Sequence, residues 1–325
     1  MRTFLAALVF TVCCAASPVR LILDTDIGND IDDALALAMV HALANRGEVQ
    51  LLAVTITKDN VYCAPYVDLV NTFYGRPHIP IGVVHNGKTP ERSPMLETPA
   101  TERADNGYFL YPHRLTTGAD APEAVSLLRR VLEAQPDGSV TIAQIGFSTN
   151  LARLLESSGG RDLLRRKVKL LSLMAGNFAE PKPEFNIYTD PESARILLRD
   201  WPTAIVFSGF EIGLRVRFPY QALNTDFLYT AHHPIVDAFK IYAPRSEDHP
   251  AWDPTAVLEA IRPDRGYFSL SVPGNVTVDS KNATVFQPDP KGRCQYLILN
   301  TEQTVRVRQV LVDLVSEPPM PLKSK

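Results

Sequence analysis

Cysteine is scarce in this chain of 325 residues, which has 4, two of them (Cys13 and Cys14) near its start. That number excludes a small fold held together by a disulfide framework, and Cys63 and Cys294 allow one bridge or none. An excess of one charge is lacking too, because 33 basic residues stand against 36 acidic ones, for a net charge of −3. A general nucleic-acid binder or a membrane-surface binder would show a basic excess, so we expect neither partner.

Hydrophobic runs long enough to span a bilayer are also missing. The apolar run Phe4–Val12 follows the basic Arg2 and is followed by small residues up to Ala16. This pattern is typical of a cleaved secretory signal peptide, and an apolar first element of the fold is the alternative. We therefore expect residues 1–16 to be a signal peptide, residues 17–325 to form one domain, and the mature protein to be secreted or periplasmic.

Hydrophobic residues make up 45% of the chain, which is enough to bury a large core. Runs rich in β-formers alternate with helical patterns along most of its length. The predicted strands are Arg20–Leu23, Val49–Ile56, Ile79–Val84, Val140–Ile145, Val168–Met174 and Ala204–Phe207. The predicted helices are Ala34–Ala44, Tyr62–Tyr74, Ala121–Glu133, Thr149–Glu156, Pro191–Leu198, Pro234–Tyr242, Pro254–Ile261 and Thr301–Val315. The alternation predicts an α/β fold with a mainly parallel, helix-covered, Rossmann-like sheet and a ligand site at the carboxyl ends of its strands.

Two segments depart from this alternation. Residues 86–120 show no periodicity and are rich in Pro, Thr, Asn and Gly, so we expect a long loop that serves as a lid or is disordered. Short strands at Tyr267–Val272, Val276–Val278, Thr284–Phe286 and Tyr296–Leu299 predict a small C-terminal β-meander at the edge of the sheet.

The loop after the first strand is unusually acidic. It carries five carboxylates within ten residues: Asp24, Asp26, Asp30, Asp32 and Asp33. Capping and the helix dipole account for one or two acidic residues at a helix start. The others would repel one another unless protons or a cation neutralised them. Because the loop offers oxygen ligands without His or Cys, it predicts a hard ion such as Ca²⁺ or Mg²⁺.

An Asp-x-Asp pair after the first strand is also found in phosphatases of the haloacid-dehalogenase type. In those enzymes a hydroxyl residue follows two places after the second Asp, where this chain has Gly28, and no phosphate-clamping Lys can be assigned. The phosphatase remains a minor alternative.

Five blocks of sequence, taken together, resemble the inosine-uridine preferring nucleoside hydrolases, which are Ca²⁺-dependent enzymes that cleave the N-glycosidic bond of ribonucleosides. Each block alone would be weak, but they occur in the family's order between residue 21 and about residue 260. The blocks are the acidic loop Asp24–Asp33, Ala53–Asn60, Gly146–Ala152, Met174–Glu192 and the pair Asp253-Pro254.

The resemblance implies a function for most polar residues of these blocks. Asp26, Asp33, the carbonyl of Thr149 and Asp253 would hold a Ca²⁺ ion, and Asp26 would accept the proton of a metal-bound water. The sugar would be bound by Asp32 and stabilised during bond cleavage by Glu184 and Asn186. The expected catalytic set is Asp26, Asn186 and Trp252. The remaining ribose contacts would come from Asn60, Met174 and Asn177.

The chain departs from the family pattern in three places. Asp30 and Ile31 lengthen the acidic loop by two residues, and Trp252 stands where members often have the His that protonates the leaving base. An indole N–H is not given up at working pH, so Trp252 is expected to stack on the base instead. Candidates for a separate acid are Tyr108, Tyr111, His113 and His249.

Two functions are compatible with these residues. The first is a secreted nucleoside N-ribohydrolase acting on small-molecule ribonucleosides. The second is a calcium- and ribose-binding protein that lacks turnover, which the loss of the usual His would favour. A homo-oligomer is left open in either case.

Overall fold

A ten-stranded sheet, parallel over most of its width, crosses the molecule in the computed structural model, which describes residues 17–320. The predicted signal peptide, residues 1–16, lies outside the described residues. β1 (Val19–Thr25) pairs with a parallel strand on either side, and its last five residues are buried. The parallel strands, in spatial order, are β12 (Cys294–Ile298), β6 (Ala204–Ser208), β5 (Val168–Met174), β4 (Val140–Gln144), β1, β2 (Val49–Lys58) and β3 (Ile81–Lys88).

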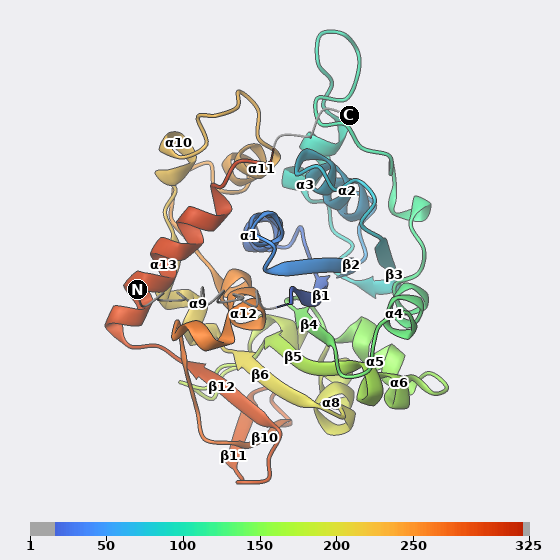
Figure 1. The fold of residues 1–325 in the computed structure, drawn as a ribbon, viewed down its shortest axis with the longest axis vertical. Coiled ribbons are helices and arrows are strands. Elements are labelled where there is room, and N and C mark those ends of the chain that lie inside the picture. Colours follow the sequence, from blue (N-terminus) through green and yellow to red (C-terminus); the bar gives the residue numbers. More distant parts are fainter. Residues whose placement is uncertain (1–16, 321–325) are drawn as a thin grey trace, which may run out of the picture.

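Helices cover both faces of the sheet, as the alternation predicts (Figure 1). One face carries α1 (Asp32–Asn45), α2 (Cys63–Phe73), α12 (Trp252–Ile261) and, further out, α11 (Pro234–Tyr242) and α13 (Thr301–Val315). The other face carries α4 (Ala124–Glu133), α5 (Thr149–Glu156), α6 (Gly160–Lys167) and α8 (Pro191–Asp200). This doubly covered sheet confirms the predicted fold class.

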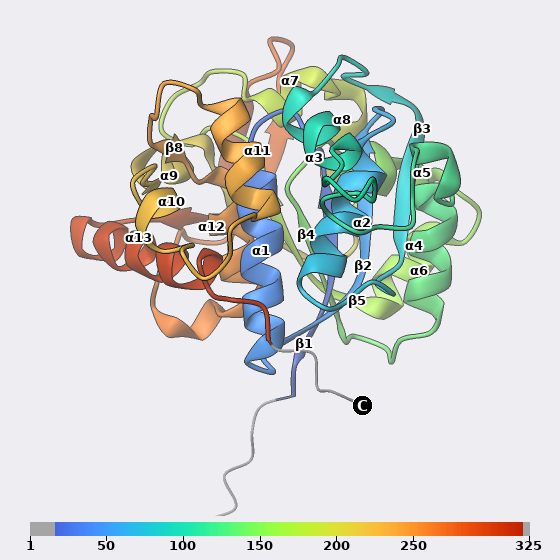
Figure 2. The ribbon, with the colours of Figure 1, turned by 90° about the horizontal axis from the view of Figure 1, so that it is seen from above.

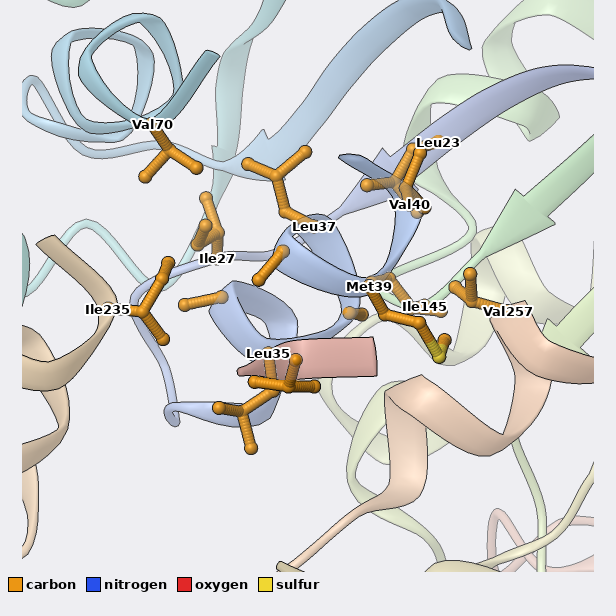
Figure 3. Close-up of a cluster of buried hydrophobic side chains, with 14 of the residues drawn as sticks. Leu23, Ile27, Leu35, Leu37, Met39, Val40, Val70, Ile145, Ile235 and Val257 are labelled. Atoms are coloured by element: carbon orange, nitrogen blue, oxygen red, sulfur yellow. The ribbon is translucent and has the colours of Figure 1, made fainter. Parts of the chain in front are cut away.

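α1 lies at the centre of the larger core. Every residue from Asp32 to Leu43 is buried, which explains why its sequence is apolar all round rather than on one stripe. Figure 3 shows its side chains between Leu23 of β1, Val70 of α2, Ile235 of α11 and Val257 of α12. A helix enclosed in this way holds its first residues, Asp32 and Asp33, in a fixed position.

The C-terminal strands differ from the expected meander in their order. β10 (Gly274–Val278) lies between β11 (Thr284–Pro288) and β12, and β12 joins the main sheet parallel to β6, with β9 (Ser269–Leu270) on it. Without β12, β6 would present an unpaired strand edge, so this pairing satisfies backbone groups that a separate meander would leave open.

The segment 86–120 is not the structureless loop that its composition suggests. It contains α3 (Pro94–Thr101) and the short η1 (Gly118–Asp120), and Met95 and Leu96 of α3 are buried. α3 packs on the acidic loop: the hydroxyl of Ser93 donates to the carbonyl of Gly28 at 2.8 Å. Gly28 has φ +109°, and a Cβ there would collide with Leu96, so this close approach requires glycine.

Short elements complete the fold. They are α7 (Phe185–Thr189), α9 (Phe210–Arg215), α10 (Ala222–Thr225), η2 (Pro263–Arg265) and a two-stranded sheet of β7 (Arg217–Phe218) and β8 (His249–Pro250). Cys63 and Cys294 are both buried and free, so they form no bridge. Within residues 17–320, no helix has the length and the apolar character needed to cross a bilayer.

Candidate active site

The acidic loop runs from the carboxyl end of β1 to the start of α1. The carboxyl ends of β4 and β5 lie at the same edge of the sheet, because the three strands are parallel. In Figure 2, α3 and α7 lie along this edge. Residues that follow β1, β4 and β5 in the sequence therefore meet there, as the predicted topology requires.

Asp24, which the sequence assigned to the acidic loop, is a residue of β1 and lies beneath the site rather than in it. It is fully buried and accepts hydrogen bonds from Thr55 Oγ1 (2.6 Å) and Asn150 Nδ2 (2.9 Å). Burial raises its pKa to about 7. These contacts tie β1 to β2 and α5, so Asp24 stabilises the floor of the site.

Three further carboxylates converge above it. Oxygens of Asp30, Asp33 and Asp253 all lie within 4.8 Å of one another. Asp33 and Asp253 are buried, and one oxygen of Asp33, Oδ2, has no hydrogen-bond partner. Burial first, and then the neighbouring carboxylates, raise the pKa of both groups. Buried like charges at this separation require a proton or a cation between them.

Asp32 links the two ends of this cluster. Its Oδ2 accepts the backbone N–H of Asp253 at 3.0 Å, while its Oδ1 is buried without a hydrogen-bond partner. The imidazole Nε2 of His249, on β8, lies 3.6 Å from that Oδ1. Asp32 therefore holds α12 against α1.

Asp26 lies beside the cluster and is oriented by a chain of two polar residues. Its Oδ2 accepts a 2.7 Å hydrogen bond from Asn29 Nδ2, and Asn29 Oδ1 accepts one of 2.8 Å from the buried Lys58. Burial raises the pKa of Asp26 to about 7, against which the bond from Asn29 acts. Lys58 also donates to the carbonyl of Thr89 at 2.6 Å, which fixes its ammonium group.

Asp26, Asp30 and Asp253 open onto a cavity of about 150 Å³. Its lining combines carboxylates, one side-chain amide and several aromatic rings. The lining residues are Asp26, Asp30, Ile145, Met174, Glu184, Phe185, Asn186, Phe210, Trp252 and Asp253.

The amide of Asn186 is held rigidly on one side of the cavity. Its Nδ2 donates to the carbonyls of Met174 (3.1 Å) and Ile145 (3.2 Å), which leaves Oδ1 as the atom available to a ligand. Glu184 caps the start of α7, because its carboxylate accepts the backbone N–H groups of Asn186 and Ile187 and also that of Gly176. Burial raises the pKa of Glu184 to about 7.

Aromatic rings form the opposite side. The ring centroids of Trp252 and Phe210 are 5.5 Å apart in a stacked arrangement, and the indole N–H of Trp252 donates to the carbonyl of Phe210 at 2.9 Å. His249 meets Trp252 edge-on at 5.7 Å. Trp252 is thus among the residues that line the cavity, and its indole N–H already donates to a backbone carbonyl.

The amino-acid sequence matches a known family. The profile described as inosine-uridine preferring nucleoside hydrolase matches residues 21–315. The chain belongs to this family.

Relatives from distant organisms agree. The inosine-uridine preferring nucleoside hydrolase of Leishmania major is 27% identical over 197 residues, which is 58% of this chain and 60% of that protein. A pyrimidine-specific ribonucleoside hydrolase of a Shewanella species is 32% identical over 220 residues, or 63% of this chain and 62% of that protein. The alignments thus span about three fifths of both curated relatives.

A solved structure shows the same fold. The purine-preferring ribonucleoside hydrolase from Gardnerella vaginalis has a TM-score of 0.68 at 19% identity, covering 91% of this chain and 98% of that one. The predicted family, fold class and enzyme class are confirmed, and the phosphatase alternative is set aside.

Five residues that the resemblance places in a nucleoside hydrolase site do not line the cavity. Two of them, Asp32 and Asp33, belong to the clusters of possible metal ligands. The others are Asn60, Thr149 and Asn177. Thr149 begins α5, where its carbonyl points along the helix axis and its hydroxyl donates to Asp190 at 2.5 Å. Asn60 is used in a turn, donating to the carbonyl of Glu91 at 3.0 Å. Asn177 accepts the backbone N–H groups of Ala179 and Glu180.

The acid candidates from the long loop are also remote. Tyr108 is 75% exposed, and the hydroxyl of Tyr111 donates to Asp237 on α11. His113 packs against Phe109, with ring centroids 4.3 Å apart. Of the four candidates, His249 alone touches a residue of the acidic loop.

Sequence reasoning missed several residues of the site. Lys58 and Asn29 had no assigned role, although a Lys that ends an apolar strand beside an acidic loop is a usable signal. Phe185 and Phe210 also line the cavity. Phe185 lies within the recognised block Met174–Glu192 and Phe210 outside all five blocks, and a single aromatic residue in a sequence cannot be distinguished from a core residue.

The residues present fit a divalent cation. The cluster offers carboxylate oxygens from two distant segments and an unpaired buried oxygen on Asp33. Among residues 17–320, both candidate clusters of metal ligands contain Asp30, and only one of them includes an imidazole, that of His249. A mainly oxygen donor set of this kind suits Ca²⁺ or Mg²⁺.

Proposed function

We propose that this member of the family is an exported, Ca²⁺-dependent enzyme that hydrolyses the N-glycosidic bond of ribonucleosides to ribose and free base. One observation carries the proposal: the carboxylate cluster faces the same cavity as Glu184, Asn186 and a wall of aromatic rings. A sugar with vicinal hydroxyls and a flat base needs those two kinds of surface side by side.

Asp33 and Asp253 would hold the ion, with Asp26 at its edge. Ca²⁺ accepts six to eight oxygen ligands in flexible geometry, so sugar hydroxyls and a water can complete its coordination. When bound, the ion lowers the pKa of a coordinated water and orients the sugar.

Asp26 is the residue placed to accept a proton from the attacking water. In the metal-free fold, burial raises its pKa to about 7, and a bound cation would favour the deprotonated form that a general base needs. Asn29 holds Oδ2, which leaves the other oxygen, Oδ1, for the water.

Asn186 and Glu184 act on the sugar side. The fixed Oδ1 of Asn186 accepts a hydroxyl hydrogen bond and faces the positive charge that develops on the sugar as the bond breaks. Glu184 positions Asn186 through the cap of α7, and its buried carboxylate adds negative potential to the same side.

Phe185, Phe210 and Trp252 form the surface for the base. A stacked ring is worth about 0.5–1.5 kcal/mol, and apolar walls exclude water from the leaving group. The curated relatives are named for inosine and uridine or for pyrimidine ribonucleosides, and the solved structure for purines. Ribonucleosides as a class are therefore the proposed substrates.

The proposed location rests on the sequence of residues 1–16. Mass spectrometry of the mature protein, recovered from the medium or periplasm, is expected to show an N-terminus near Ser17. An intact Met1 in a cytoplasmic pool would contradict export.

A panel of nucleosides with and without Ca²⁺ tests the activity, with release of free base as the readout. Asp26→Asn is expected to abolish release, and Asp105→Asn, on an exposed loop, serves as the charge-matched control. Trp252 in place of the usual acid favours the second candidate, a binding protein without turnover. Saturable nucleoside binding with no base released by the unmodified protein would establish that candidate and overturn the enzyme.

A further inference from the structure

We propose that Asp30, a residue of the two-residue extension of the acidic loop, is a direct ligand of the metal ion. Its carboxylate lies within 4.8 Å of those of Asp33 and Asp253, and it lines the cavity. Asp26, which the resemblance makes a ligand, belongs to neither candidate cluster in the described part of the chain. The inference rests on the proposed cation-dependent function and assigns a ligand that the resemblance does not.

Among residues 17–320, no Lys or Arg side chain forms an ion pair with Asp30. The nearest candidate is His249, whose Nε2 is 3.9 Å from Asp30 Oδ2, which is beyond hydrogen-bond distance. The ammonium group of Lys58 is engaged by Asn29 and Thr89. Asp30 therefore lies close to the buried carboxylates of Asp33 and Asp253, and the three negative charges would repel one another. A bound cation would relieve this repulsion.

A second feature of the site points to the same ion. The Oδ2 atom of Asp33 is fully buried and has no hydrogen-bond partner, although Thr25 donates to the other oxygen of that residue. An oxygen left unpaired in this way costs free energy unless a ligand satisfies it. The atom belongs to the side chain that shares its cluster with Asp30 and Asp253.

The extension also explains how Asp30 reaches the ion. Ile31 is fully buried and immediately precedes α1, so it anchors the end of the loop in the core. Gly28 makes the preceding turn with φ +109°. Between these two fixed points Asp30 lies over the start of α1, beside Asp33 and across from Asp253.

Terbium luminescence provides a test that does not depend on turnover, because Tb³⁺ is a hard ion that binds oxygen ligands and its decay rates in H₂O and D₂O count coordinated waters. Asp30→Asn is expected to add a coordinated water and to weaken Ca²⁺ binding, measured by calorimetry, by roughly 10- to 100-fold. Asp105→Asn should match the unmodified protein. Asp33→Asn should lose the ion, which confirms that the readout reports this site.

The outcomes separate the two proposals. If the unmodified protein binds neither ion, the cation-dependent function fails. If it binds both, and Asp30→Asn keeps the hydration number and the affinity, Asp30 is no ligand and the inference is overturned. The variant His249→Gln shows whether Asp30 binds the ion or only pairs with His249. The inference expects this variant to keep the hydration number of the unmodified protein. If His249→Gln gains a coordinated water and Asp30→Asn does not, the inference is overturned. Circular dichroism of each variant verifies folding.

Discussion

The backbone N–H of Asp253 donates a 3.0 Å hydrogen bond to Oδ2 of Asp32, joining the first residues of α12 and α1 across 221 positions of sequence. Because both helices are packed in the core, this bond sets the separation of Asp33 and Asp253, the residues that would hold the ion. The geometry of the cluster therefore depends on the packing of two helices that are remote in sequence.

Replacing Asp32 tests this link. Asp32→Asn keeps an acceptor for the amide of Asp253, whereas Asp32→Ala leaves that buried N–H unpaired. Both variants remove the same charge, so the alanine variant is expected to be about 1–3 kcal/mol less stable than the asparagine variant. Urea unfolding in the presence of a chelator measures the difference. Equal stabilities would show that the hydrogen bond contributes nothing.

Lys58 and Asn29 are expected to act as a unit that orients Asp26. In Lys58→Met, Asn29 Oδ1 loses its donor, and kcat is expected to fall roughly tenfold with a smaller change in KM. Asn29→Ala should have a similar effect. The double variant should be no worse than either single one, because the residues lie in one chain of contacts. Lys88→Met, at an exposed position, is the matched control. If the losses in kcat of the two single variants add in the double variant, Lys58 and Asn29 act independently and the prediction is wrong.

Stabilisation by Ca²⁺ is expected to increase with pH. Burial raises the pKa of Asp26 from 3.8 to about 7 in the metal-free fold. Because the pKa of Asp26 is higher in the folded state, this carboxyl stabilises the fold at pH values below its pKa in the unfolded chain. The contribution is lost as the pH rises through about 7. Calcium needs the deprotonated carboxylates, so its affinity rises over the same interval.

Melting temperatures with Ca²⁺ and with a chelator, compared from about pH 5.5 to about pH 8, measure this effect. The gap between the two curves should widen toward higher pH. A gap that is constant or that narrows would mean that the carboxylates of the cluster do not titrate in this range.

Trp252 is expected to support the base by stacking rather than by proton transfer. Trp252→Ala removes the ring, and a loss of about 0.5–1.5 kcal/mol corresponds to a two- to tenfold rise in KM for nucleosides. Trp252→Phe retains an aromatic face and should lie near the unmodified enzyme. Measuring kcat and KM of both variants with inosine and uridine tests the stacking role. If Trp252→Ala behaves like the unmodified enzyme, the stacking role is wrong.

Much of the architecture follows from the sequence alone. The periodicities predicted α5, α11, α13 and β5 to the residue, because these elements have clear apolar patterns and capping or proline signals at their ends. The segment 86–120 was harder, since α3 is short, contains Pro99 and owes its formation to packing against Gly28 and α11. The order of the C-terminal strands was not predicted. It depends on the pairing of β12 with the open edge of β6, and a local sequence pattern does not encode that pairing.

The sequence by itself determined that five carboxylates follow the first strand, that they precede a helix, and that the surrounding motifs belong to one hydrolase family. Only the tertiary structure decided which of those oxygens face one another. Asp24 lies below the site, Asp26 is turned toward Asn29, and Asp30 joins Asp33 and Asp253. Asn60, Thr149 and Asn177 are used in turns or at a helix start instead. The physical reason is that a side chain's direction depends on the turn that carries it and on the long-range packing of that turn. Spacing along the chain fixes neither.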